Sequence, residues 1–143
     1  MAWEMQPRYS PDGRTLAYIS DRDGGDNIWL HTLADDTRRA LTTEKFRLLN
    51  NPAFSPDGRF VVGRKHFTTG RSLGTGELWL YHIAGGSGQQ LLARPNKKHQ
   101  KEVGEPIFAA DGQAIFFSKD TTPGDRFAYA QDSNGQILSL IHI

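Results

Sequence analysis

The sequence predicts an all-β fold, a partial β-propeller in which about three four-stranded antiparallel blades form an open arc. The first observation is a motif that occurs three times, at residues 6–13, 51–58 and 105–112: a polar residue, Pro, any residue, an aromatic residue, two variable residues and Asp-Gly. The second is its spacing, since the three prolines are 45 and 54 residues apart, close to the period of a four-stranded blade. The third is the absence of any helix signal of useful length. Closed propellers have about 4–8 blades, so three cannot complete a ring.

The repeated motif is interpreted as the first strand of a blade followed by its hairpin turn. A residue before proline favours an extended backbone, and proline suits the first position of a strand. In the Ser-Pro-Asp-Gly turn at 55–58, Pro presets φ, Asp bonds its own backbone and Gly takes positive φ. We therefore expect each polar residue before a proline to be extended and to lie just outside a strand.

The other strands of each blade follow as short apolar or β-branched segments. The blades span 6–42, 51–93 and 105–137, and Trp79 in the second is equivalent to Trp29 in the first. The predicted strands are 15–20, 27–32 and 38–42 in the first blade, 60–64, 77–82 and 90–93 in the second, and 114–118 with a start near 135–137 in the third.

Composition limits the classes of function. A hydrophobic content of 37% and a charged content of 23% fit a globular protein. The net charge of +1 argues against nucleic-acid or membrane-surface binding through bulk electrostatics. The absence of cysteine excludes disulfides and thiolate metal sites. No apolar run approaches the ~20 residues of a membrane span, and residues 1–4 do not form a signal peptide.

The repeats resemble the TolB-like β-propeller repeats, which are relatives of WD repeats. Residues 6–42 match that pattern fully, 51–93 match it with a loop insertion, and 105–137 match it more loosely. In the first repeat the matching residues are Ser-Pro-Asp-Gly at 10–13, Ser-Asp-Arg-Asp-Gly at 20–24, Asp-Asn-Ile-Trp at 26–29 and Leu-Thr at 41–42. Two further stretches, 65–76 and 127–135, resemble the propeller upstream of a metal-dependent amidohydrolase domain in some large exported bacterial hydrolases.

This resemblance implies a non-catalytic module of a larger exported hydrolase, periplasmic or secreted, with the amidohydrolase type favoured. The module would gate substrate or bind a partner, and its partners would be a protein or the peptide-like or small-molecule substrate of an attached domain. Two alternatives stay open: a stand-alone TolB-like interaction propeller, and the propeller of a prolyl-oligopeptidase-like serine peptidase.

The last six residues, 138–143, stand apart from the repeat. They can be encoded by CTGTCTCTTATACACATC, a common sequencing-library transposon end. We expect the natural sequence to end near Ile137, so that residues 1–137 are a propeller fragment of a longer gene product and 138–143 are a non-native tail. An ordinary apolar strand is the alternative interpretation.

Loop lengths indicate which face carries function. In a four-stranded blade, the turns after strands one and three share one face, while the loops after strand two and between blades share the other. Only tight turns fall on the first face, and function concentrates on long loops held by a rigid scaffold. The long loops predicted for the second face, called the long-loop face below, are 21–26, 43–50, 66–76, 94–104 and 119–133.

Two groups of candidate binding residues lie on this face. Gln6, Asn51 and Glu105 occupy equivalent positions and should rim the mouth of the central channel, which the innermost strands line; a solvated strand end is the alternative. A local cationic cluster could receive an anionic group or an acidic partner surface, or could be a solvated basic loop. The cluster consists of Arg64, Lys65, His66 and Arg71.

Catalytic and metal sites are not predicted. The five histidines show no HxH or HxxxH spacing with a completing carboxylate, and there is no Gly-x-Ser-x-Gly nucleophile elbow. We therefore expect no catalytic residue, no metal and no cofactor in this chain, and whether the parent protein is an enzyme is left open.

Overall fold

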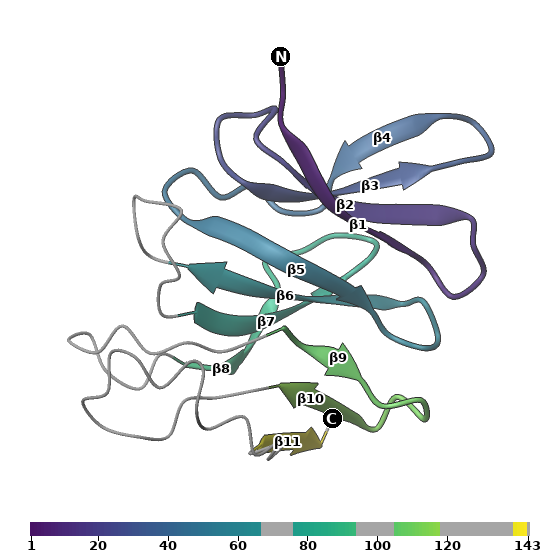
Figure 1. The fold of residues 1–143 in the computed structure, drawn as a ribbon, viewed down its shortest axis with the longest axis vertical. Coiled ribbons are helices and arrows are strands. Elements are labelled where there is room, and N and C mark those ends of the chain that lie inside the picture. Colours follow the sequence, from purple (N-terminus) through teal and green to yellow (C-terminus); the bar gives the residue numbers. More distant parts are fainter. Residues whose placement is uncertain (67–75, 94–104, 118–138, 143) are drawn as a thin grey trace, which may run out of the picture.

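The computed structural model describes residues 1–66, 76–93 and 105–117 and the backbone of 139–142, and in these ranges it contains strands and no helix. Three separate antiparallel sheets follow one another along the chain, and Figure 1 shows them stacked as successive layers. Within the described ranges, no helix has the length and apolarity to cross a membrane. The predicted all-β class, antiparallel blades and open arrangement are confirmed.

The first two sheets are complete blades with the strand order of the sequence. The third has the order β11-β10-β9. The strands of the first blade are β1 (Glu4–Tyr9), β2 (Thr15–Ser20), β3 (Asn27–Thr32) and β4 (Thr37–Ala40). Those of the second are β5 (Leu48–Phe54), β6 (Phe60–His66), β7 (Gly76–His82) and β8 (Gln89–Leu92). Those of the third are β9 (Ile107–Phe108), β10 (Ala114–Phe117) and β11 (Ser139–His142). The interpretation of 138–143 as a non-native tail stays a prediction.

The hydrophobic core lies between blades. We call the side of a blade that faces the preceding blade its leading face, and the opposite side its trailing face. The trailing face of blade one contributes Ala17, Ile19, Ile28 and Leu30, which pack against the leading face of blade two. A second cluster joins the trailing face of blade two to Ile115 of blade three. Because each blade buries apolar area against its neighbour, the stacking itself stabilises the fold.

The two third-strand tryptophans occupy equivalent positions, as predicted. Tyr18 pairs with Trp29 across strands, and Gly63 pairs with Trp79. Trp79 is partly buried against the core that blades one and two share. A Cβ built on Gly63 would lie 2.9 Å from Cδ1 of Ile28. Glycine therefore stands at this position because blade one approaches closely here.

The residues before the first two prolines depart from the sequence expectation. Gln6 and Asn51 have φ of 55° and 52°, and the pairing of β1 and β5 with their neighbours shifts register at these points. The extended conformation expected from proline's effect on its predecessor is therefore wrong: both residues form left-handed bulges inside strands that start earlier, at Glu4 and Leu48. A bulge leaves one residue unpaired, so the following proline interrupts no ladder hydrogen bond.

The Asp-Gly turns follow the prediction closely. Gly13, Gly58 and Gly112 have φ near 70°. In each turn the Asp Oδ1 accepts a hydrogen bond from the N–H two residues later, at 2.9 to 3.0 Å. Side-chain chemistry and glycine thus close the hairpin without help from other blades.

Candidate functional site

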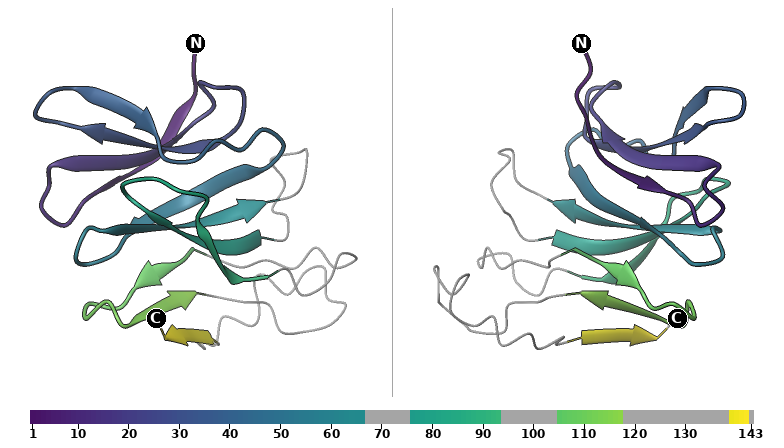
Figure 2. Two further views of the ribbon diagram at one scale, coloured as in Figure 1. Left: turned by 180° about the vertical axis from the view of Figure 1, so that it is seen from behind. Right: turned by 45° about the vertical axis from the view of Figure 1, so that its right-hand side comes forward.

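The described loops segregate to two faces as predicted. The tight turns after β1, β3, β5, β7 and β9 lie together on one side of the stack, and the connections 21–26 and 41–47 lie on the other (Figure 2). The predicted loops 94–104 and 119–133, and most of 66–76, lie outside the described residues. Part of the predicted loop 43–50 is strand, because β5 begins at Leu48.

Gln6, Asn51 and Glu105 form one row across the three blades. The side-chain carbonyl of Gln6 accepts a hydrogen bond from the backbone N–H of Asn51 at 2.7 Å. The side-chain amide of Asn51 donates to Oε1 of Glu105, also at 2.7 Å. The guanidinium of Arg8 lies 4.0 Å from Oε2 of Glu105. The three residues predicted from their equivalent positions in the repeat are therefore neighbours in space. Gln6 lies in β1, Asn51 in β5 and Glu105 just before β9.

The position of this polar row differs from the one expected. Two of its members lie inside strands rather than at a strand end, and Asn51 is buried. The hydrogen bonds of the row join neighbouring blades, so much of the hydrogen-bonding capacity of these side chains is used within the protein. Glu105 and Arg8 are exposed and are the part of the row that a ligand could reach. Arg8 was missed because its equivalents, Ala53 and Ile107, are apolar.

The three described residues of the predicted cationic cluster do not lie in an exposed loop. Arg64, Lys65 and His66 are the last residues of β6 and are buried, with 7%, 3% and 4% exposure. Strand alternation places Lys65 on the leading face and the other two on the trailing face. Arg71 lies outside the described residues. The correction follows from the length of β6, which continues to His66 where the sequence suggested a loop.

Lys65 is instead the centre of a buried ionic contact between blades one and two. Its Nζ lies 2.5 Å from Oε1 of Glu44 and 3.7 Å from the centre of the Trp79 ring. The indole N–H of Trp79 donates to Oε2 of Glu77 at 2.8 Å. Burial, with Glu44 as the next cause, raises the pKa of Tyr81. A cation held by an aromatic ring and a carboxylate is well compensated for its burial.

These contacts brace the connection between the two complete blades. Glu44 donates its backbone N–H to Oδ1 of Asn27 at 2.7 Å, and its carbonyl accepts from Nδ2 of Asn27 at 2.9 Å. Arg47 lies 3.8 Å from Glu77. Between these anchors Phe46 is 91% exposed. The loop therefore presents a large apolar side chain from a fixed backbone, a feature that Lys45-Phe46-Arg47 does not reveal in sequence.

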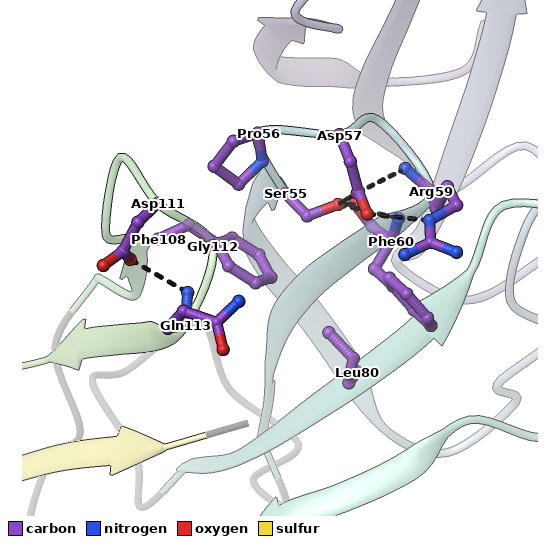
Figure 3. Close-up of a pocket in the computed structure, with 10 residues that line it drawn as sticks. All are labelled: Ser55, Pro56, Asp57, Arg59, Phe60, Leu80, Phe108, Asp111, Gly112 and Gln113. Carbon is purple, nitrogen blue, oxygen red and sulfur yellow. Dashed lines mark hydrogen bonds and ion pairs between the residues drawn. The ribbon is translucent and has the colours of Figure 1, made fainter.

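A groove of about 440 Å³ lies on the opposite, tight-turn face, between blades two and three (Figure 3). Phe60, Leu80 and Phe108 are among the side chains that line it. On the charged rim of the groove, Asp57 already has partners within the protein. It accepts hydrogen bonds from the Ser55 hydroxyl at 2.6 Å and from the Arg59 side chain at 2.7 Å. The Ser55 hydroxyl, followed by the Arg59 backbone N–H and side chain, lowers the pKa of Asp57. The part of the rim formed by Asp57 is therefore already hydrogen-bonded within its own turn.

The described residues contain no group of three or more His, Cys, Asp or Glu side chains arranged to hold a metal ion. The histidine on β3, His31, contacts Asp36 with Nε2 at 2.7 Å from Oδ1.

In sequence, the chain is similar to curated TolB proteins and to a curated peptidase. No family model matches it. It is 31% identical to the Tol-Pal system protein TolB of Bordetella pertussis over 120 residues, which are 84% of this chain and 25% of that protein. It is 27% identical to the uncharacterized peptidase YuxL of Bacillus subtilis over 151 residues, 83% of this chain and 22% of that protein. The chain thus spans a quarter or less of the length of these relatives.

Solved structures show the same architecture. A putative TolB from Agrobacterium tumefaciens superposes with a TM-score of 0.63 at 19% identity, covering 81% of this chain and 39% of that one. Dipeptidyl peptidase 4 from Porphyromonas gingivalis gives 0.60 at 18% identity, covering 81% and 22%. Together with the three stacked blades, these likenesses identify the chain as a partial β-propeller built from TolB-like repeats.

Proposed function

We propose that the chain is a non-catalytic propeller segment of a larger exported hydrolase, which binds a partner or controls substrate entry through its long-loop face. One observation carries this proposal: the connection 43–47 is fixed at both ends and presents Phe46 almost fully exposed. Rigid aromatic side chains contribute much of the binding energy at protein interfaces. A loop that is already ordered also loses little entropy on binding.

The relatives favour a peptide-like substrate for the attached enzyme. YuxL and dipeptidyl peptidase 4 are named as peptidases, and a prolyl endopeptidase structure also superposes, with a TM-score of 0.62 at 13% identity. The attachment to an amidohydrolase domain, and a periplasmic or secreted location, are supported only by the sequence resemblance.

A second candidate is a stand-alone TolB-like propeller that binds another protein. The 31% identity to TolB of Bordetella pertussis supports it. It predicts the same interaction face, so the two candidates differ in what is attached to the propeller rather than in which residues make contact.

Site-specific photocrosslinking in the parent protein would test the proposal. A photoreactive amino acid replaces Phe46 on the long-loop face or, as the matched control, Asp35 in the exposed turn between β3 and β4 on the other face. We expect a crosslink to the protein partner or to an added peptide substrate from position 46 and none from position 35. Crosslinking from position 35 alone, or equally from both, would contradict the proposed face.

Enzyme kinetics would then separate substrate gating from partner binding. If the propeller gates an attached peptidase, Phe46→Ala should change kcat/KM for long peptides more than for dipeptide-sized substrates, while Asp35→Ala changes neither. If the propeller binds a separate protein, Phe46→Ala should weaken that complex and leave peptide hydrolysis unchanged.

A further inference from the structure

The groove between the turns of blades two and three has an aromatic side chain where the equivalent crevice between blades one and two has a small polar one. Phe60 lines the groove and is half-buried, and its equivalent in blade one is Thr15. The Phe60 ring packs edge-on against His82, with the ring centroids 5.1 Å apart. Leu80 and Phe108 add apolar surface from the two blades. The groove, with a volume of about 440 Å³, therefore has a well-supported apolar wall.

The turn of blade three leaves a carboxylate without the cation that the turn of blade two supplies. In blade two, the Arg59 side chain donates to Oδ2 of Asp57 at 2.7 Å. The equivalent residues in blade three are Gln113 and Asp111, which are exposed and line the groove. Oδ1 of Asp111 accepts the backbone N–H of Gln113 at 2.9 Å, and within the described part of the chain Asp111 makes no ion pair. A negative charge therefore stands uncompensated at one side of the groove.

A second guanidinium of the first crevice is also missing from this groove. Arg39, on the outer strand β4, reaches from blade one to the carbonyl of Ile83 in blade two. The N–H of Ile83 donates to the carbonyl of Arg59 at 2.9 Å, so the Arg39 guanidinium lies near the turn of blade two. Gln89 takes the place of Arg39 in blade two, since both pair with the equivalent leucine of the third strand. Glutamine is shorter and uncharged, so this second crevice lacks the cation that spans the first.

We propose that the groove between blades two and three binds an arginine side chain of a peptide segment in a partner protein. Figure 3 shows Asp111 and Gln113 on one side of the groove and the internally paired Asp57 and Arg59 on the other. The guanidinium of the partner pairs with the carboxylate of Asp111, in the bidentate geometry that arginine favours. The side-chain carbonyl of Gln113 is a further acceptor beside it.

The apolar wall defines the residue next to that arginine. Phe60, Leu80 and Phe108 take an apolar side chain of the segment, which removes their surface from water. The volume of about 440 Å³ lies at the lower end of the range of about 300–1,000 Å³ for small-ligand pockets, so it suits one or two side chains. An anionic ligand is disfavoured, because the one guanidinium that lines the groove, that of Arg59, is already paired with Asp57. The groove lies on the face opposite Phe46, so this proposal does not depend on the proposed function.

Titration of the full chain with two short peptides, followed by heteronuclear NMR, tests the proposal. The first peptide is acetyl-Leu-Arg-amide, and the second carries citrulline in place of arginine, a neutral side chain of nearly the same shape. We expect the arginine peptide to shift the amide signals of Phe60, Gly112 and Gln113, with a Kd in the millimolar range. The citrulline peptide should bind about fivefold more weakly, which is the effect of losing one exposed ion pair.

Three variants assign the preference to the carboxylate. Asp111→Asn, which keeps the size of the side chain, should abolish the preference for arginine over citrulline. Asp12→Asn makes the same change in the equivalent turn of blade one, outside the groove, and should leave the preference intact. Gln113→Arg gives blade three the internal arginine of blade two, and it should prevent binding of the arginine peptide while signals away from the groove stay unchanged.

The two peptides decide the matter on the unmodified chain, whatever the variants do to its stability. Equal affinities for arginine and citrulline, or shifts confined to residues outside the groove, would overturn the proposal. So would an arginine preference that survives in a folded Asp111→Asn chain, because the cation would then have another partner.

Discussion

Single side chains fasten one blade to the next, and Trp79 does so with both its ring and its N–H. Replacing it with Ala removes packing against blade one, the contact with Lys65 and the hydrogen bond to Glu77. Because the ring is only partly buried, we expect a loss of about 3 kcal/mol, at the low end for a core aromatic. Urea denaturation followed by circular dichroism measures it, with Trp79→Phe as the milder control. An unchanged midpoint for Trp79→Ala would contradict the packing described here.

Two substitutions of Lys65 test whether the volume or the charge of its buried side chain stabilises the fold. Lys65→Ala should cost about 2–3 kcal/mol, because it leaves a cavity beside Trp79 and removes the partner of Glu44. Lys65→Met fills the same space without a charge, and Glu44 retains some access to water, so its cost should be within about 1 kcal/mol. Denaturation midpoints of both variants decide the matter. If Met is as costly as Ala, the ammonium itself stabilises the fold.

At the scale of single residues, the sequence predicts which residues lie together better than it predicts which of them are buried. Gln6, Asn51 and Glu105 could be grouped because equivalent positions in a repeat must lie at equivalent places in successive blades. The burial of Arg64 and Lys65 could not be foreseen, because it depends on where β6 ends, on Glu44 in the connection before β5, and on Asn50 of β5. Phe46 escaped notice because exposure of one aromatic residue leaves no periodic signal.

Among the elements, the bulges in β1 and β5 are the least expected feature and give a clear prediction. Asn51 combines φ of 52° with a hydrogen bond to Glu105. Asn51→Ala loses the hydrogen bond and keeps a left-handed residue with a Cβ, whereas Asn51→Gly loses only the hydrogen bond. Alanine should therefore be the more destabilising by about 1 kcal/mol. Thermal melts compare the two directly, and a less stable glycine variant would argue against the left-handed bulge.

The aspartates of the hairpin turns make the stability of the fold depend on pH. Hydrogen bonds from Ser55 and then from Arg59 lower the pKa of Asp57 below its ordinary value of 3.8, and Ser10 does the same for Asp12. Because the folded pKa is the lower one, the stabilisation is complete above about pH 4 and is lost as the pH falls through the folded pKa. Asp57→Asn should therefore flatten the dependence of Tm on pH below 4 and leave its slope above pH 5 unchanged. A slope identical to that of the unmodified chain in acid would show that the turn contributes nothing to acid sensitivity.

Strand identity was more predictable than strand ends. Every predicted strand in the first two blades is present, because apolar content and turn residues are local signals. The starts of β1 and β5 were placed too late, since the left-handed bulge at Gln6 and Asn51 interrupts the expected pattern in mid-strand. Cross-blade hydrogen bonds stabilise that conformation, and no local rule contains them.

At the scale of the whole molecule, the order of the blades follows from one repeated set of contacts. Proline of one turn meets glycine of the next, and the apolar trailing face of one blade meets the aromatic leading face of its successor. The repeat period predicted the number of blades and their open arrangement. It could not predict which surfaces remain uncovered, because that requires comparing burial at equivalent positions.

Nuclear Overhauser contacts in the 16.0 kDa chain test the stacking of three blades most directly. The account predicts cross-peaks between the δ-protons of Pro11 and the α-protons of Gly58, and between those of Pro56 and Gly112, with none between Pro11 and Gly112. Cross-peaks between the paired residues Ile19 and Ile28 serve as the internal control for a folded blade. If those control peaks appear and both proline–glycine pairs are silent, the blades do not stack in the order described, and the central claim is wrong.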